Sequence, residues 1–295
     1  MTRARDMAPP FCHNRTVADR LPSHPEVALI CIHFPTGEHS GAWNMAFDRL
    51  LMEQVRIGRW DFVLRTYGWT PACVSIGKLQ DASREINREA LEASGYGLVR
   101  RPTGGRAVWH ETEVTYSVTA RIDHPMVTGH VSEALRKVAA PMADAISRLG
   151  IAVSLSPLER HGFAGPREGA NPCFTSHGSW EVGTADGRKL VGSAQARSRG
   201  VFLEHGSILL ENDQPKLLDF LPEPVTGETR ERLASRLADG IATLREFIPG
   251  LGSSDVEAAL AASFGAALED DLITTDHAML HGPELDALVL EQEHV

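Results

Sequence analysis

The sequence has few cysteines, few aromatic residues and no long apolar run. Its 295 residues include four cysteines, Cys12, Cys31, Cys73 and Cys173, and no two of them have C-x-x-C spacing. This pattern indicates neither a zinc site nor a small disulfide framework. The apolar runs are far shorter than the ~20 residues that cross a bilayer, and the first residues lack the apolar centre of a signal peptide. We therefore expect a cytoplasmic protein without a membrane segment or a metal.

Positive charge is also scarce. Lysine and arginine number 29 against 39 aspartates and glutamates, which gives a formal net charge of −10. Such a balance provides no general electrostatic reason to bind nucleic acid. An acidic chain can still carry a local basic patch. An acidic partner protein would have to bind at such a patch.

The hydrophobic pattern predicts an α+β fold. Strand-like segments come in runs and do not alternate strictly with helices, which favours a mixed, largely antiparallel sheet flanked by helices. We expect strands at 27–34, 62–69, 72–78, 98–110, 114–122, 151–156, 179–184, 189–198 and 201–210, with 62–69 and 72–78 forming a pair. Helical periodicity occurs at 43–55, 86–94, 131–149, 230–247 and 255–268.

The same pattern divides the chain into three parts. Residues 1–26 lack periodicity and are expected to form a disordered leader. Residues 27–215 form the main domain, and 216–295 form a helical extension packed on it. Inside the main domain, 156–172 is rich in proline, glycine and charge, which suits a surface loop or lid. Cys173 follows this loop directly, whereas Cys31 and Cys73 lie in apolar runs and are expected to be small buried side chains.

Two glycine-containing motifs carry the candidate chemistry. Residues 100–110 read RRPTGGRAVWH, and 187–206 read GRKLVGSAQARSRGVFLEHG. A glycine pair allows close approach of the backbone to a ligand, the lysine supplies a positive charge, and a cysteine thiol is a nucleophile. Each feature alone also fits a hairpin turn, a solvated lysine or a structural histidine. Together they suggest acyl-group chemistry.

The order of the motifs resembles a known family. NMAFD, RTYGWTPACVSIGKLQDASREIN, RRPTGGRAVWHETEVTYSV and GRKLVGSAQARSRGVFLEHGSILL occur in the order found in the biotin/lipoate protein ligase superfamily, over roughly residues 30–215. Arg106 replaces the third glycine of the lipoate ligases, and NPCF precedes SWEV. The chain is most similar to the Gram-positive octanoyltransferases of the LipM type, which implies the biotin/lipoate ligase catalytic-domain fold.

The resemblance also implies roles for individual residues. Cys173 is the acyl-thioester nucleophile, and Lys189 lowers its pKa by stabilising the thiolate. Glycines and neighbouring residues of both motifs are expected to line the acyl tunnel and to donate hydrogen bonds to the oxyanion. These are Gly104, Gly105, Gly192, Ser193 and Ala194, with Arg101, His110, His205 and Gly206 as further substrate contacts.

The implied reaction moves an octanoyl group from acyl carrier protein to a lysine of an apo lipoyl domain or of the glycine-cleavage H protein. The donor is already a thioester, so we expect no nucleotide and no cofactor. Three alternatives remain open: an ATP-dependent lipoate ligase, an amidotransferase that moves octanoyl between lipoyl domains, and a binding module without catalysis.

Overall fold

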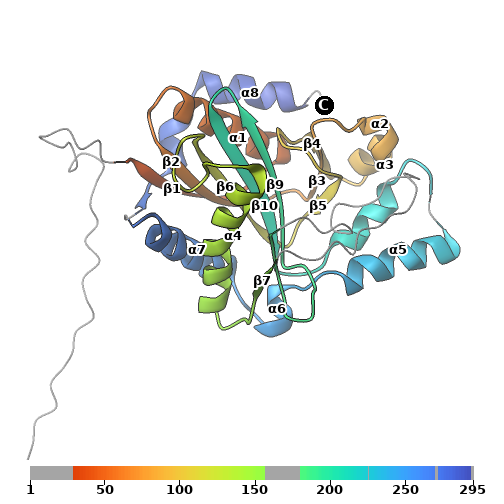
Figure 1. Cartoon of the computed structure of the whole chain (residues 1–295). Coiled ribbons are helices and arrows are strands. Elements are labelled where there is room, and N and C mark those ends of the chain that lie inside the picture. Colours follow the sequence, from red (N-terminus) through yellow and green to blue (C-terminus); the bar gives the residue numbers. More distant parts are fainter. Residues whose placement is uncertain (1–28, 157–179, 225, 270–271, 294–295) are drawn as a thin grey trace, which may run out of the picture.

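The computed structural model describes residues 29–156, 180–224, 226–269 and 272–293 (Figure 1). Its centre is a six-stranded sheet in the order β11-β1-β2-β6-β10-β9. These strands are β1 (Cys31–His39), β2 (Phe62–Trp69), β6 (Glu113–Arg121), β9 (Val191–Ser198), β10 (Val201–Leu209) and β11 (Ile273–Thr274). β1 runs parallel to β2 and β11, and the other neighbours are antiparallel. The predicted α+β fold with a mixed sheet is confirmed.

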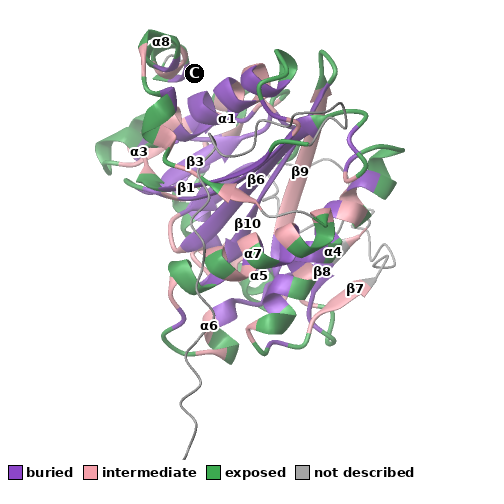
Figure 2. Cartoon of the chain, turned by 90° about the vertical axis from the view of Figure 1, so that its left-hand side faces the viewer, coloured by how far each residue is buried: buried purple, intermediate pink, exposed green. Residues whose placement is uncertain are grey.

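Helices cover both faces of this sheet. Helix α1 (Gly41–Arg56) lies on one face, and α4 (Val131–Arg148) and α7 (Ser253–Leu268) lie on the other (Figure 2). Alternating residues of a strand point to opposite faces. In β2, Val63 accordingly joins the apolar cluster under α1, while Phe62 joins the cluster under α4 and α7. The sheet is therefore buried on both sides.

Two small sheets flank the main one. β3 (Cys73–Ile76), β4 (Gly97–Arg100) and β5 (Val108–His110) form one, with β3 in the middle, and β7 (Ser154–Ser156) pairs with β8 (Glu181–Gly183) in the other. The predicted pairing of 62–69 with 72–78 is wrong, because β2 already has β1 and β6 on its two edges. Cys31 and Cys73 are buried, as expected.

The remaining elements lie at the edges of these sheets. They are α2 (Ala82–Glu85), α3 (Arg88–Ala93), the 3₁₀ helix η3 (Gln214–Phe220), α5 (Gly227–Asp239), α6 (Leu244–Phe247), the 3₁₀ helix η4 (His277–Leu280) and α8 (Pro283–Glu293). The helical window 230–247 is interrupted after Asp239, where backbone groups of Gly240 and Ala242 bond to Lys189. β11 shows that the C-terminal part also supplies a strand. No helix in the described ranges has the length and apolar character of a membrane span.

Candidate active site

A narrow cavity lies between the α1 side of the main sheet and the loop that follows β4. Eight residues singled out from the sequence line it: Arg101, His110, Lys189, Gly192, Ser193, Ala194, His205 and Gly206. Six further residues complete the lining: Met45, Tyr67, Trp69, Val108, Thr115 and Ser207. The two motifs, far apart in the sequence, thus meet at one site.

Lys189 enters this cavity from the segment before β9. Its residue exposure is only 3 %. Its backbone N–H donates to the Gly240 carbonyl at 3.0 Å, and its carbonyl accepts from Ala242 N–H at 2.9 Å. These bonds fix the backbone of Lys189. Because the residue is buried, it is not the solvated lysine that is the simpler interpretation of the motif.

Arg101 holds the RRPTGGR loop against β3. Its Nη1 donates to the carbonyl and the hydroxyl of Ser75 at 2.8 and 2.7 Å, and its Nη2 donates to the carbonyls of Gly104 and Arg106 at 3.0 and 2.8 Å. Gly104 and Gly105 belong to this loop but are not among the cavity-lining residues. Their expected contact with the acyl group therefore stays a prediction.

The Gly104–Gly105 turn packs against a third glycine. A side chain at Gly77 would bring its Cβ within 2.2 Å of the Gly105 carbonyl oxygen. Such a contact is impossible without a backbone shift. A glycine at position 77 is therefore required for the RRPTGGR loop to pack this closely against the end of β3.

His110 belongs to a buried polar network on the cavity wall. Its Nε2 lies 2.6 Å from the Ser75 hydroxyl, and its Nδ1 lies 2.9 Å from Glu113 Oε1. Because Arg101 donates to the same hydroxyl, Ser75 is left to donate to Nε2, which favours a ring proton on Nδ1 facing Glu113. Trp69 stacks on the His110 ring with centroids 4.1 Å apart. The imidazole is thus held in one orientation beside the cavity.

His205 is held by a second network centred on Asp48 of α1. Asp48 is fully buried and accepts from Arg65 Nη1 at 2.7 Å and from Ser117 at 2.9 Å. Burial disfavours its charge, but Arg65 and His205 outweigh that effect and hold the pKa of Asp48 below its ordinary value. The ionised carboxylate can only accept, so His205 donates from Nδ1 at 3.2 Å and accepts from the Thr103 hydroxyl at Nε2, at 2.6 Å.

This arrangement keeps His205 neutral. Burial, with Arg101 and His110 nearby, lowers the pKa of His205 despite the opposing effect of Asp48. Asp48 was part of the NMAFD motif but was not predicted as a site residue. The signal that could have identified it is an acid that shares the buried face of an amphipathic helix with Met45, Leu51 and Val55.

Part of the cavity lining is apolar. Met45, Tyr67, Trp69 and Val108 contribute to it, and all four are buried. Apolar side chains of this kind are the usual surroundings of a hydrocarbon chain, and Lys189, Ser193 and His205 belong to the same lining. The lining therefore combines apolar walls with a few polar groups. Cys173, the predicted nucleophile, lies outside the described residues.

Solved structures with this fold include lipoate-protein ligases. A bipartite lipoate protein ligase with its E2 lipoyl domain from Thermoplasma acidophilum matches with a TM-score of 0.69 at 22% identity, over 90% of this chain and 92% of that chain. Lipoate-protein ligase A bound with ATP matches with a TM-score of 0.65 at 22% identity, over 89% and 94%. At this identity the likeness defines the fold alone.

The sequence defines the family. The model of the lipoyl protein ligase A/B catalytic domain matches residues 40–265, and the chain belongs to this family. "Octanoyltransferase LipM" of Kyrpidia tusciae is 42% identical over 237 residues, which cover 79% of this chain and 85% of the relative. "Octanoyltransferase LipM" of Bacillus subtilis is 38% identical, over 72% and 77% of the two chains.

Proposed function

We infer that this chain is an octanoyltransferase of lipoate biosynthesis. The observation that carries this inference is the similarity to several octanoyltransferases at about 40% identity over most of both chains. The cavity agrees with it, since apolar walls and a fixed lysine share one site. We propose octanoyl-acyl carrier protein as the donor and a lysine of an apo lipoyl domain or glycine-cleavage H protein as the acceptor.

The first step forms an acyl-enzyme. The thiolate of Cys173 attacks the carbonyl carbon of the donor thioester, and the resulting oxyanion collapses with cleavage of the donor C–S bond. The carrier leaves as a thiolate and takes up a proton. Lys189 contributes a positive charge that stabilises the Cys173 thiolate over the thiol, which raises the reactive fraction at neutral pH. Backbone N–H groups of the Gly192–Ala194 segment are the proposed hydrogen-bond donors to the oxyanion.

The second step forms the product amide. The neutral amine of the acceptor lysine attacks the carbonyl of the Cys173 thioester, the amine loses a proton, and the Cys173 thiolate leaves. His110 and His205 lie on the cavity wall with fixed orientations and act as positioning groups in this scheme. Because a thioester is already activated relative to an amide, neither step consumes a nucleotide.

The experiment that tests this function compares two donors. Purified protein with apo H protein as acceptor receives either octanoyl-acyl carrier protein without ATP or free octanoate with ATP. We expect acceptor octanoylation in the first mixture, measured by intact-protein mass spectrometry. Product only in the second mixture would identify an ATP-dependent ligase. A third mixture, with an octanoylated lipoyl domain as the donor, is added for the remaining alternative, and product only in this mixture would identify an amidotransferase.

A further inference from the structure

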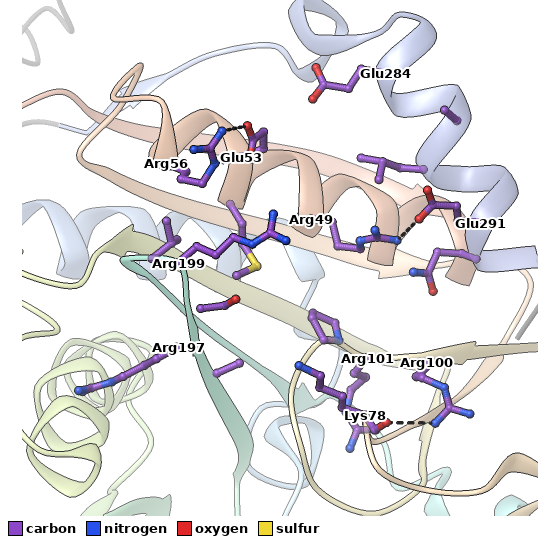
Figure 3. Close-up of a pocket in the computed structure, with 18 residues that line it drawn as sticks. Arg49, Glu53, Arg56, Lys78, Arg100, Arg101, Arg197, Arg199, Glu284 and Glu291 are labelled. Atoms are coloured by element: carbon purple, nitrogen blue, oxygen red, sulfur yellow. Dashed lines mark hydrogen bonds and ion pairs between the residues drawn. The ribbon is translucent and has the colours of Figure 1, made fainter.

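A large groove lies on the outer side of the RRPTGGR loop. Its volume is about 780 Å³, and its lining comes from α1, α8, the loop after β3, the residues after β4 and the β9–β10 hairpin. Ten of its lining residues are charged: Arg49, Glu53, Arg56, Lys78, Arg100, Arg101, Arg197, Arg199, Glu284 and Glu291 (Figure 3). Arg101 also lines the acyl cavity, so the two spaces share a wall residue.

The charge of this groove is opposite to that of the whole chain. Seven of the ten charged lining residues are cationic and three are acidic, in a protein with a formal net charge of −10. Both terminal nitrogens of the Arg101 and Arg197 guanidinium groups are bonded to backbone carbonyls of other residues. Five cationic side chains therefore remain against three acids: Arg49, Arg56, Lys78, Arg100 and Arg199. Arg49 pairs with Glu291 at 2.8 Å, and Arg56 pairs with Glu53. A concave surface with an excess of one charge concentrates partners of the other charge.

The loop that carries Lys78 is held in place beside the groove. Arg100 donates from Nη1 to the carbonyls of Gly77 and Gln80 at 3.2 and 2.5 Å. Lys78 itself is exposed and lines the groove.

We propose that this groove docks the acidic carrier protein that donates the acyl group, with the phosphodiester of its prosthetic arm lying among the groove cations. This proposal rests on the proposed function. The thioester of the donor is attached to a prosthetic arm that contains a phosphodiester. A positively charged groove attracts this negatively charged group. The shared residue Arg101 places the end of the groove at the acyl cavity, where the arm must deliver its acyl group.

The outer wall of the groove lies outside the family domain. The family model ends at residue 265, whereas α8 contributes Glu284, Ala287, Leu288, Glu291 and Gln292 to the lining. Through the Arg49–Glu291 pair, α8 is joined to α1 beside the groove. The C-terminal helix therefore completes the docking surface.

The test reverses two exposed charges that lie outside the acyl cavity. In the variant Lys78→Glu/Arg199→Glu, we expect the kcat/KM for octanoyl-acyl carrier protein to fall at least ~10-fold, because electrostatic steering is worth ~10- to 1,000-fold in association rate. We expect added salt to lower the wild-type rate and to lower the variant rate much less, because salt screens the charges of the groove. The rate from octanoyl-pantetheine, which has neither phosphate nor protein, stays unchanged in the variant, as does the KM for the acceptor.

A matched control changes the same net charge elsewhere. Arg148→Glu/Arg232→Glu alters two exposed arginines outside the groove lining and is expected to retain the wild-type rate. An equal loss in this control, or a raised acceptor KM with an unchanged donor rate, would overturn the proposal.

Binding is measured separately from catalysis, by fluorescence anisotropy of labelled octanoyl-acyl carrier protein. Binding to the wild type and not to the groove variant supports the docking site even if the chain transfers no octanoyl group. Equal binding to both proteins overturns it.

Discussion

Lys189 is the described residue on which the proposed chemistry depends most. Its backbone is fixed by two hydrogen bonds to the segment after α5, and it lines a cavity together with the cationic Arg101 and with apolar and polar uncharged groups. An ammonium in such a place acts more strongly than one in water, because the surrounding dielectric constant is low. This setting makes its electrostatic effect on Cys173 testable.

Replacing Lys189 by alanine should therefore slow the alkylation of Cys173. With the positive charge removed, the thiol pKa rises and the thiolate fraction near pH 7 falls. Lys189→Arg retains part of the effect, since the charge remains. The measurement is the pH profile of iodoacetamide modification at Cys173, followed by peptide mapping. An alkylation profile identical to that of the wild type would leave Lys189 as a substrate contact only.

Met45 is expected to set the length of the acyl chain. It is a flexible, unbranched side chain on the apolar wall of the cavity and is 1% exposed. Met45→Ala opens space there, so the ratio of decanoyl to octanoyl transfer should rise several-fold, with a stability loss of roughly 2–5 kcal/mol. Met142→Ala is the control, because Met142 is equally buried in the cluster under α4. If the ratio of decanoyl to octanoyl transfer rises in both variants, the effect comes from a general loosening of the hydrophobic core and not from the space opened at Met45.

At the scale of elements, the β6–β10–β9 part of the sheet carries a buried acid. Glu204 of β10 accepts from the Tyr116 hydroxyl at 3.1 Å, and that hydroxyl lies 2.7 Å from Ser193 Oγ of the cavity lining. Its Oε2 is buried without a hydrogen-bond partner in the described part of the chain. Burial raises the pKa of the Glu204 carboxyl to about 8, although the Tyr116 hydrogen bond opposes this shift.

The raised pKa predicts a specific pH dependence of stability. Between pH 4.5 and about 8 the folded protein holds a proton that the unfolded chain releases, so folding becomes less favourable as the pH rises. Glu204→Gln removes this dependence. We compare the free energy of unfolding of Glu204→Gln with that of the wild type at each pH by urea denaturation. Between pH 5 and pH 8 the difference should change by a few kcal/mol in favour of the variant, because one pKa unit corresponds to about 1.4 kcal/mol.

The control for this measurement is Glu231→Gln, an exposed position of α5. We expect its unfolding curve to follow that of the wild type at both pH values. A constant difference between Glu204→Gln and wild type across the range would show that Glu204 is ionised in the folded protein.

The sequence predicted elements better than it predicted their partners. β2 and β10 were found because each begins with three consecutive apolar residues and is rich in β-branched or aromatic residues. The pairing of β3 could not be found, since it depends on which strand edges are already occupied. Two-residue β11 lies in a segment whose helical neighbours dominate the periodicity.

For the candidate site as well, the sequence predicted residues better than it predicted their contacts. The motif residues Arg101, His110 and Lys189 do meet at one cavity. Asp48 and Trp69 reach the site's networks only through the packing of α1 and β2 against the motif loops. The sequence does mark Asp48 as an acid on the buried face of its helix, but no local pattern encodes which residues Asp48 and Trp69 contact.

At the scale of the whole molecule, the protein separates two tasks on either side of the RRPTGGR loop. The acyl cavity is small and largely apolar, whereas the groove is wide and positively charged, and Arg101 belongs to both. Carrier recognition and acyl chemistry can then be altered independently, by the groove variants and the cavity variants described above.

The proposed mechanism requires that Cys173 carries the octanoyl group. Its most direct test is intact-protein mass spectrometry after incubation with octanoyl-acyl carrier protein alone, followed by peptide mapping. We expect one octanoyl adduct, on Cys173, that neutral hydroxylamine removes, and a slowly formed, persistent adduct in Cys173→Ser because an oxyester is attacked less readily. An adduct on Cys31 or Cys73, or full transferase activity in Cys173→Ala, would contradict the account.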